Sequence, residues 1–118
     1  MPPRELARLD LAAGHLAELR GLLEQHAPDA EVWAFGSRVS GGAHEGSDLD
    51  LVLRNVRDPS APVEGWADLI EALQASALPM LVEVHDWSRL PGEFHAGIAR
   101  RYVVVQGGHR HEAVDAGR

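Results

Sequence analysis

Two spacings of hydrophobic residues alternate along the chain and predict an order of helices and strands. From Leu6 to Leu23, leucine and alanine recur every three or four residues, which predicts an amphipathic helix that ends before Pro28. The segments 66–77 and 88–101 repeat this spacing and predict two further helices. Short apolar segments predict strands at 32–35, 49–53, 80–87 and 102–106. This order predicts the α/β (α+β) class, a single domain with a mixed sheet of about four strands flanked by helices.

The length of 118 residues fits one domain, because domains usually contain about 100 to 150 residues. We expect the domain to span 1–106 and residues 107–118 to form a flexible tail, where His109 and His111 are more typical of exposed side chains than of a metal site. A small core is also compatible with a homo- or hetero-oligomer. No apolar run approaches the roughly 20 residues of a membrane-spanning helix, so we expect a cytoplasmic protein without membrane contact.

The charged residues exclude several classes of function. There are 18 Asp and Glu against 11 Lys and Arg, for a net charge of -7, which argues against direct binding to nucleic acid, since basic residues make the phosphate contacts. All the basic residues are arginines, and the chain contains no cysteine. A Walker lysine, a Schiff base, a thiolate nucleophile and a cysteine-based zinc site are therefore excluded.

The turn after the first predicted strand combines residue types that bind phosphate. Gly36 follows the apolar segment 32–35, and a residue without a side chain lets the backbone approach a ligand closely. Backbone amides in such a turn and the Ser37 hydroxyl can donate to phosphate oxygens, and Arg38 adds a charge suited to phosphate. Taken alone, such a glycine-rich segment is most often only a turn.

The next predicted strand adds two carboxylates. Leucine and other residues alternate over 49–53, so the leucines share one face, and Asp48 and Asp50 share the other. Residues two apart on a strand are about 6 to 7 Å apart, close enough for their carboxylates to bind magnesium together. The alternative is a solvated strand face without a ligand.

Gly36 and Ser37 are separated by ten residues from Asp48-Leu49-Asp50. This matches the signature G-S-x10-D-x-D, and in this the chain resembles the polymerase-beta-like nucleotidyltransferase superfamily. The form G-S-R with S-D-L-D-L is similar to the smallest branch, the MNT-type minimal nucleotidyltransferases. The resemblance covers most of the chain and implies the nucleotidyltransferase fold. It implies transfer of a nucleoside monophosphate, expected to be AMP from ATP, to a hydroxyl with release of pyrophosphate. The implied nucleotide-binding residues are Gly36, Ser37, Arg38 and Ser47.

The resemblance also implies catalytic carboxylates that hold two magnesium ions, Asp48, Asp50 and a third on a later strand. Relatives usually carry an aspartate as the third, and by register Glu83 takes its place, one methylene longer. The alternative for Glu83 is an edge-strand charge that prevents aggregation. Asp86 is a weaker candidate on the opposite strand face. His85 shares the face of Glu83 and could touch a substrate, although a partly buried polar residue is the plainer interpretation.

The acceptor hydroxyl is implied by the family as well. MNT-type proteins are commonly encoded with HEPN-domain partners as antitoxin and toxin, and the antitoxin can adenylylate a tyrosine of the toxin. We therefore expect an antitoxin that modifies a HEPN-type partner, and an acidic surface would suit docking onto a basic, RNA-cleaving protein. The alternative is a nucleotide-binding antitoxin with weak or no catalysis that neutralises its partner by complex formation. The glutamate at position 83 keeps this alternative open.

Overall fold

The computed structural model describes residues 8–107, and its elements follow the predicted order. The predicted α+β class with a mixed four-stranded sheet is confirmed. Leu6 and the predicted tail beyond residue 107 lie outside the described residues. Within those residues, no helix has both the length and the apolar character to cross a membrane. The elements are α1 (Ala13–His26), β1 (Ala30–Phe35), α2 (Ser37–Ser40), β2 (Leu49–Asn55), α3 (Trp66–Gln74), β3 (Val82–Asp86), a 3-10 turn at Trp87–Arg89, α4 (Gly92–Arg100) and β4 (Val103–Gln106).

The sheet has the strand order β3-β2-β1-β4. Strand β1 pairs antiparallel with both β2 and β4, and β2 pairs parallel with β3. Because two parallel strands cannot be joined by a tight hairpin, the chain crosses from β2 to β3 through α3. The two strands that carry the predicted carboxylates are therefore direct neighbours.

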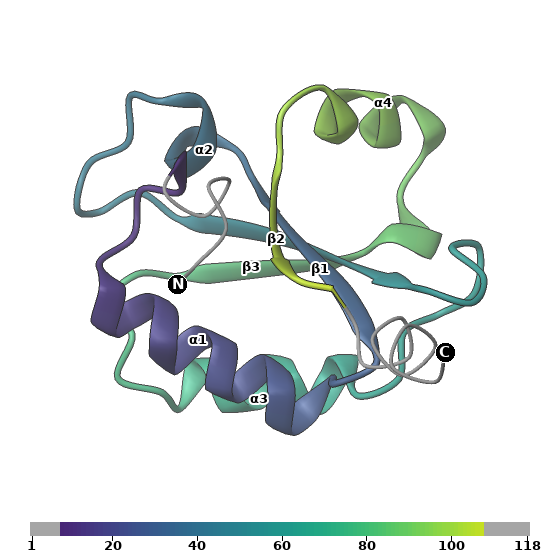
Figure 1. The fold of residues 1–118 in the computed structure, drawn as a ribbon, viewed down its shortest axis with the longest axis horizontal. Coiled ribbons are helices and arrows are strands. Elements are labelled where there is room, and N and C mark those ends of the chain that lie inside the picture. The colour runs from purple at the N-terminus through teal and green to yellow at the C-terminus, as the bar shows by residue number, and fades with distance from the viewer. Residues whose placement is uncertain (1–7, 108–118) are drawn as a thin grey trace, which may run out of the picture.

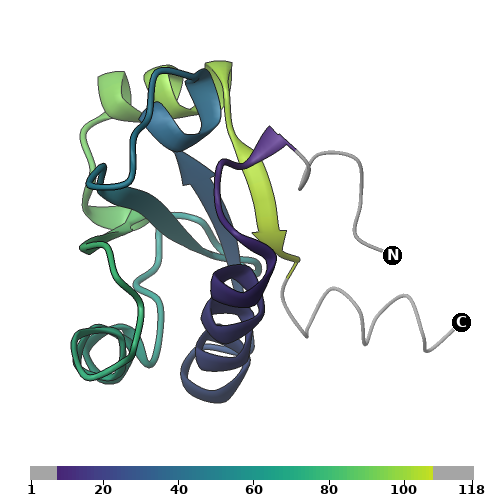
Figure 2. The ribbon, with the colours of Figure 1, turned by 90° about the vertical axis from the view of Figure 1, so that its left-hand side faces the viewer.

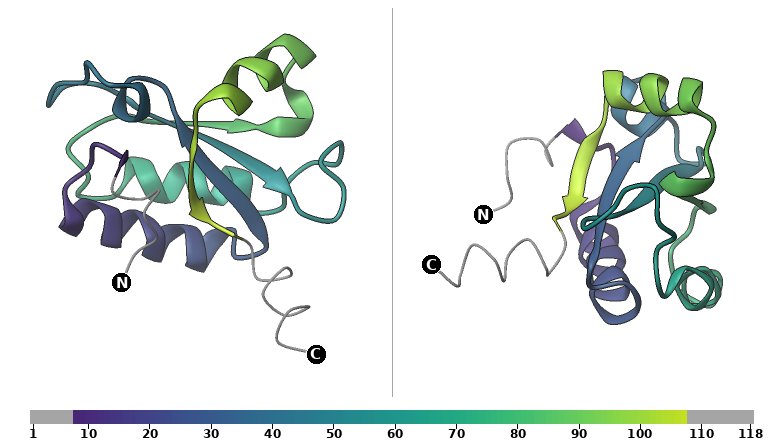
Figure 3. Two further views of the ribbon diagram at one scale, coloured as in Figure 1. Left: turned by 45° about the horizontal axis from the view of Figure 1, so that its top comes forward. Right: turned by 90° about the vertical axis from the view of Figure 1, so that its right-hand side faces the viewer.

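Helices cover both faces of the sheet (Figures 1 and 2). The pair α1 and α3 lie side by side on one face, as Figure 3 shows from two further sides, and α4 lies on the other. Leu49, Leu51 and Leu53 of β2 are fully buried and pack with Leu19 and Leu23 of α1. The predicted alternation of β2 is confirmed, and its leucine face forms the main core.

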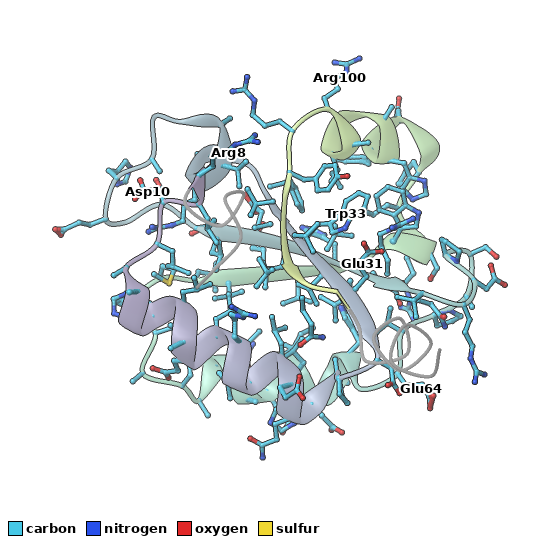
Figure 4. All side chains as sticks on the ribbon, in the orientation of Figure 1. Arg8, Asp10, Glu31, Trp33, Glu64 and Arg100 are labelled. Atoms are coloured by element: carbon cyan, nitrogen blue, oxygen red, sulfur yellow. The ribbon has the colours of Figure 1, made fainter. Side chains whose placement is uncertain are left out.

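The face under α4 carries a smaller, aromatic core around Trp33, which Figure 4 labels. Its ring stacks on Tyr102 with the ring centroids 3.9 Å apart, and Ile98 of α4 packs against the same cluster. The Arg54 guanidinium lies 4.4 Å from the Trp33 ring and pairs with Glu31 at 2.6 Å. The positive charge of Arg54 is therefore attracted both by the aromatic rings and by the carboxylate.

The first helix is shorter than its hydrophobic pattern predicts. The pattern begins at Leu6, whereas α1 begins at Ala13, and Leu9 is buried in the turn before it. The N–H of Asp10 donates to the carbonyl of Arg38 at 2.7 Å, and the carbonyl of Asp10 accepts from the Arg38 guanidinium at 2.8 Å. These bonds hold the segment against α2, where Figure 4 shows Asp10, and prevent the helix from starting earlier.

The helix predicted over 88–101 is divided into a 3-10 turn and α4. Pro91 separates them, because proline has no N–H to continue a helical ladder. Asp86 is 4% exposed, and its carboxylate accepts from the N–H and hydroxyl of Ser88 and from the N–H of Val63. Asp86 therefore stabilises a turn, and it takes no part in the carboxylate site.

Gly65 lets α1 and α3 approach each other, which gives a test of the fold. It has φ +83°, and a Cβ there would overlap the carbonyl oxygen of His26. We expect Gly65→Ala to lower the free energy of unfolding by roughly 2 to 4 kcal/mol, through backbone strain and this overlap. Gly21→Ala, in mid-helix with open space around an added Cβ, should raise it by up to about 1 kcal/mol. Urea denaturation measures the free energy of unfolding of both variants. Equal changes in the two variants would contradict the close packing of Gly65 against His26.

Candidate active site

Asp50 and Glu83 lie side by side on adjacent strands, on the sheet face that carries α4. The register pairs Asp50 with Glu83 of β3 and, on its other side, with Phe35 of β1. One ligand atom each of Asp50, Glu83 and His85 lies within 4.8 Å of the other two. The structure therefore brings together two of the carboxylates expected from the sequence. It adds His85, whose plainer interpretation was a partly buried polar residue.

Asp48 lies just outside this cluster. It is exposed and precedes β2, which begins at Leu49, so it is carried by the loop before the strand. Its charge still reaches Asp50, where it contributes to the raised pKa. The expected pair of aspartates thus consists of one residue fixed by the sheet and one carried by the preceding loop.

The electrostatics of Asp50 indicate a place for a cation. Burial raises the pKa of Asp50 above its ordinary value of 3.8, and the charge of Glu83 and a hydrogen bond with its side chain raise it further. His85 acts in the opposite direction. Closely spaced carboxylate oxygens are the donors that magnesium prefers, and a divalent cation would remove their mutual repulsion. The chemistry of these donors fits the metal that the family resemblance implies.

Gly36 is the residue that brings the turn after β1 up to the carboxylates. It has φ +83°, and a Cβ at this position would overlap Oδ2 of Asp50. Ser37 begins the single turn of α2, whose first helical hydrogen bond is donated by Val39 to the Gly36 carbonyl at 3.0 Å. The N–H groups of Ser37 and Arg38 precede this bond. They belong to the turn for which the sequence predicts phosphate binding.

Arg38 has a structural position that the sequence did not reveal. It is 6% exposed, and each nitrogen of its guanidinium donates to a backbone carbonyl: Nη1 to Asp10, Nε and Nη2 to Ser47, and Nη2 also to Glu45. Ser47 is fixed in the same loop, where its hydroxyl accepts from the N–H of His44 at 3.0 Å. These contacts hold the loop that carries Asp48. The expected contacts of Arg38 and Ser47 with the nucleotide remain predictions.

A pocket of about 480 Å³ opens beside Gly36, between the end of β1 and α4. Its size is in the range of small-ligand sites. Phe94 lies in the segment 88–101, for which the sequence predicts an amphipathic helix, yet it is 55% exposed and lines this pocket. The other lining residues are Phe35, Gly36, Ser40, Glu93, Gly97, Ile98 and Arg101.

Known proteins share this combination of fold and motif. Residues 16–91 match the family described as nucleotidyltransferase domain, which is more than half of the chain. The chain belongs to this family and is, as predicted, a transferase. Over 102 residues it is 40% identical to the probable protein adenylyltransferase MntA of Haemophilus influenzae, a match that covers 85% of this chain and 86% of the relative. Within its family it is an MNT-type minimal nucleotidyltransferase, and the resemblance stated from the motif is confirmed.

A solved structure has a similar fold. A chain in a crystal structure described as a toxin-antitoxin with AMP-PNP superimposes with a TM-score of 0.63, over 84% of this chain and 78% of that chain. The two sequences are 19% identical, so the likeness concerns the fold alone. It shows that the α+β fold of this chain also occurs in a solved structure.

The pKa of Asp50 generates a prediction for the metal-free protein. Because the pKa of Asp50 is raised above 3.8, the folded state binds the proton more tightly than the unfolded state. The free energy of unfolding therefore falls as the pH rises from below 3.8 through the raised pKa. Asparagine carries no charge, so we expect Asp50→Asn to melt at a higher temperature than the wild type at neutral pH. The difference should shrink as the pH is lowered toward about 4.

Circular dichroism melts in the presence of a chelator measure this effect. Asp68→Asn, an exposed change in the first turn of α3, is the matched control: it removes a carboxylate that the helix N-terminus favours, so it should not raise the melting temperature. If Asp50→Asn melted at or below the wild-type temperature at neutral pH, Asp50 would not be under electrostatic strain.

Proposed function

We propose that this protein transfers AMP from ATP to a hydroxyl of a protein partner, a tyrosine of a HEPN-type toxin, and so acts as an antitoxin. The observation that carries the proposal is the position of Gly36 against Asp50, with Glu83 beside it. Its support in the comparisons is the identity of 40% to a probable protein adenylyltransferase. The HEPN partner and the tyrosine come from the family resemblance.

The roles of the residues follow from their places. Asp48, Asp50 and Glu83 would hold magnesium, which would neutralise charge on the triphosphate. The turn at Gly36 and Ser37 would bind phosphate oxygens through its N–H groups. The acceptor oxygen bonds to the α-phosphorus, and the bond from that phosphorus to the bridging oxygen of the β-phosphate breaks. Pyrophosphate leaves with the electron pair, and the acceptor proton passes to solvent.

Arg38 would act on the same reaction from a distance. Its bonds to the carbonyls of Ser47 and Glu45 fix the end of the loop from which Asp48 extends. Because Asp48 has no strand partner of its own, its carboxylate depends on this loop for its position. We assign Arg38 and Ser47 to holding the site in place.

Glu83 favours the catalytic form of this proposal over its alternative, a nucleotide-binding antitoxin with little or no turnover. The glutamate replaces the aspartate of relatives, but its carboxylate still lies in register with Asp50 and within the ligand cluster. The longer side chain reaches the site from an edge strand. The register with Asp50 therefore supports Glu83 as the third carboxylate of the proposed reaction.

The nucleoside part of ATP fits the pocket under α4. The pocket shares Gly36 with the phosphate-binding turn, so a nucleotide bound at that turn would have the pocket within reach. Phe35 and Phe94 offer apolar ring faces for a planar base. The acceptor would then approach from outside this pocket. The net charge of -7 supports docking onto a basic partner.

A labelling experiment tests the transfer. The chain, its genomic partner protein and magnesium are incubated with ATP labelled at the α-phosphate, and label on the partner's tyrosine is the expected result. We expect Asp50→Asn and Asp48→Asn to reduce the rate at least about 100-fold, which corresponds to roughly 2.7 kcal/mol of transition-state stabilisation. Asp68→Asn removes the same charge from the far side of the protein and should retain the wild-type rate.

The outcomes separate the two functions. Transfer of label by Asp50→Asn at the wild-type rate would show that Asp50 is not part of the catalytic site. Tight binding of the partner without transfer of label, across magnesium and ATP concentrations, would favour the non-catalytic antitoxin.

Gly97 on α4 offers a test of the pocket. An added Cβ there meets nothing within 4 Å, so Gly97→Ala should fold well and gain up to about 1 kcal/mol of helix stability. Leucine at the same position should fill part of the pocket, and we expect Gly97→Leu to weaken ATP binding at least about tenfold. Calorimetric titration with ATP measures binding, and circular dichroism verifies the fold. Unchanged affinity in Gly97→Leu would place the nucleoside elsewhere.

A further inference from the structure

His85 brings a nitrogen donor into a site for which the proposed function uses only oxygen donors. It lies two residues after Glu83 on β3, so both side chains emerge on the same face of the sheet. The register pairs His85 with Val52 and Glu83 with Asp50, which sets the three polar side chains on two neighbouring strands. One ligand atom from each lies within 4.8 Å of the others.

The ring of His85 also has an aromatic neighbour on the side that faces the middle of the sheet. Its centroid lies 5.9 Å from that of Phe35, and the two rings are tilted by 45°. Phe35 is the β1 partner of Asp50 in the register, so the contact keeps the imidazole near the carboxylate. Donors placed on strands and restrained by a neighbouring ring are more precisely positioned than donors on a loop.

We propose that Asp50, Glu83 and His85 bind one manganese(II) ion together, and that the imidazole makes this position select Mn²⁺ over Mg²⁺. The inference rests on the metal site of the proposed function and assigns to it a ligand and a metal that the family motif does not contain. Asp48 and the other coordination positions remain for oxygen donors, including those of a nucleotide.

The choice of metal follows from the donor types. Mg²⁺ binds oxygen at about 2.0 to 2.1 Å, demands near-octahedral geometry and usually keeps several waters. Imidazole is a ligand of transition ions and not one that Mg²⁺ prefers. Mn²⁺ is the weakest binder of the first-row series, but it combines transition-ion character with the same acceptance of carboxylate, water and phosphate oxygens as Mg²⁺. A site of two carboxylates and one imidazole therefore gives Mn²⁺ a bond that Mg²⁺ does not gain.

Pulsed electron paramagnetic resonance provides a readout that is independent of activity. The full-length protein is loaded with one equivalent of Mn²⁺, and a coupling to the imidazole nitrogen is the expected signal. We expect His85→Asn to remove this coupling, to raise the dissociation constant for Mn²⁺ at least about tenfold and to leave that for Mg²⁺ within about twofold. His85→Phe, which keeps a ring against Phe35, should behave in the same way and covers the case in which the asparagine variant folds poorly.

Matched controls identify the nitrogen. The double variant H109N/H111N removes the imidazoles near the C-terminus, and His15→Asn removes one from α1. Both should retain the nitrogen coupling and the Mn²⁺ affinity of the wild type. A coupling that disappears in the double variant and persists in His85→Asn would assign the metal to the tail and overturn the proposal.

The remaining outcomes separate this inference from the proposed function. A wild-type protein that binds Mn²⁺ without nitrogen coupling, or no more tightly than Mg²⁺, refutes the role of His85 whether or not label is transferred. A protein that shows the nitrogen coupling but transfers no label to its partner with either metal retains the manganese site and loses the proposed adenylylation.

Discussion

The strict alternation of side chains along β2 is the constraint on which both the core and the candidate active site depend. Leu49 and Leu51 are fully buried against the α1 and α3 layer, so Asp50 between them must emerge on the opposite face. A register slip of one residue would move the leucines to the solvent side and the carboxylate into the core. The hydrophobic effect that holds the helices on the sheet therefore also fixes the direction of the carboxylate.

The same geometry places like charges together. Parallel pairing sets Glu83 directly beside Asp50, and the positive φ of Gly36 brings the backbone of the following turn against the same carboxylate. Such crowding opposes folding in the absence of a ligand and becomes favourable once a cation binds. Local rules of stability are commonly broken at functional sites, and the crowded carboxylates at Asp50 are a departure of this kind.

The elements that follow from local spacing could be predicted, and those that depend on distant contacts could not. The alternation of β2 and the position of Glu83 on one strand face are visible in the sequence because both follow the two-residue period of a strand. The glycine-rich turn is visible from its residue types. The start of α1 at Ala13 depends on bonds between Asp10 and Arg38, which are 28 residues apart. The burial of Arg38 was hidden for the same reason, since a sequence displays a charge but not the carbonyls that surround it. The exposed position of Phe94 could not be predicted without knowing how α4 lies on the sheet.

The position of Asp50 within the sheet would also let the nucleotide and the acceptor of the proposed reaction approach from different sides. On one side of Asp50 lies the pocket under α4, which is large enough for a nucleoside. On the other side lies β3, which forms an edge of the described sheet, and Leu81 just before it is 58% exposed. A small acceptor would need an enclosed site, whereas an open edge admits a folded protein. The asymmetry of the site is therefore better suited to a protein hydroxyl than to a small-molecule acceptor, and it places Glu83 and His85 on the side from which that hydroxyl would arrive.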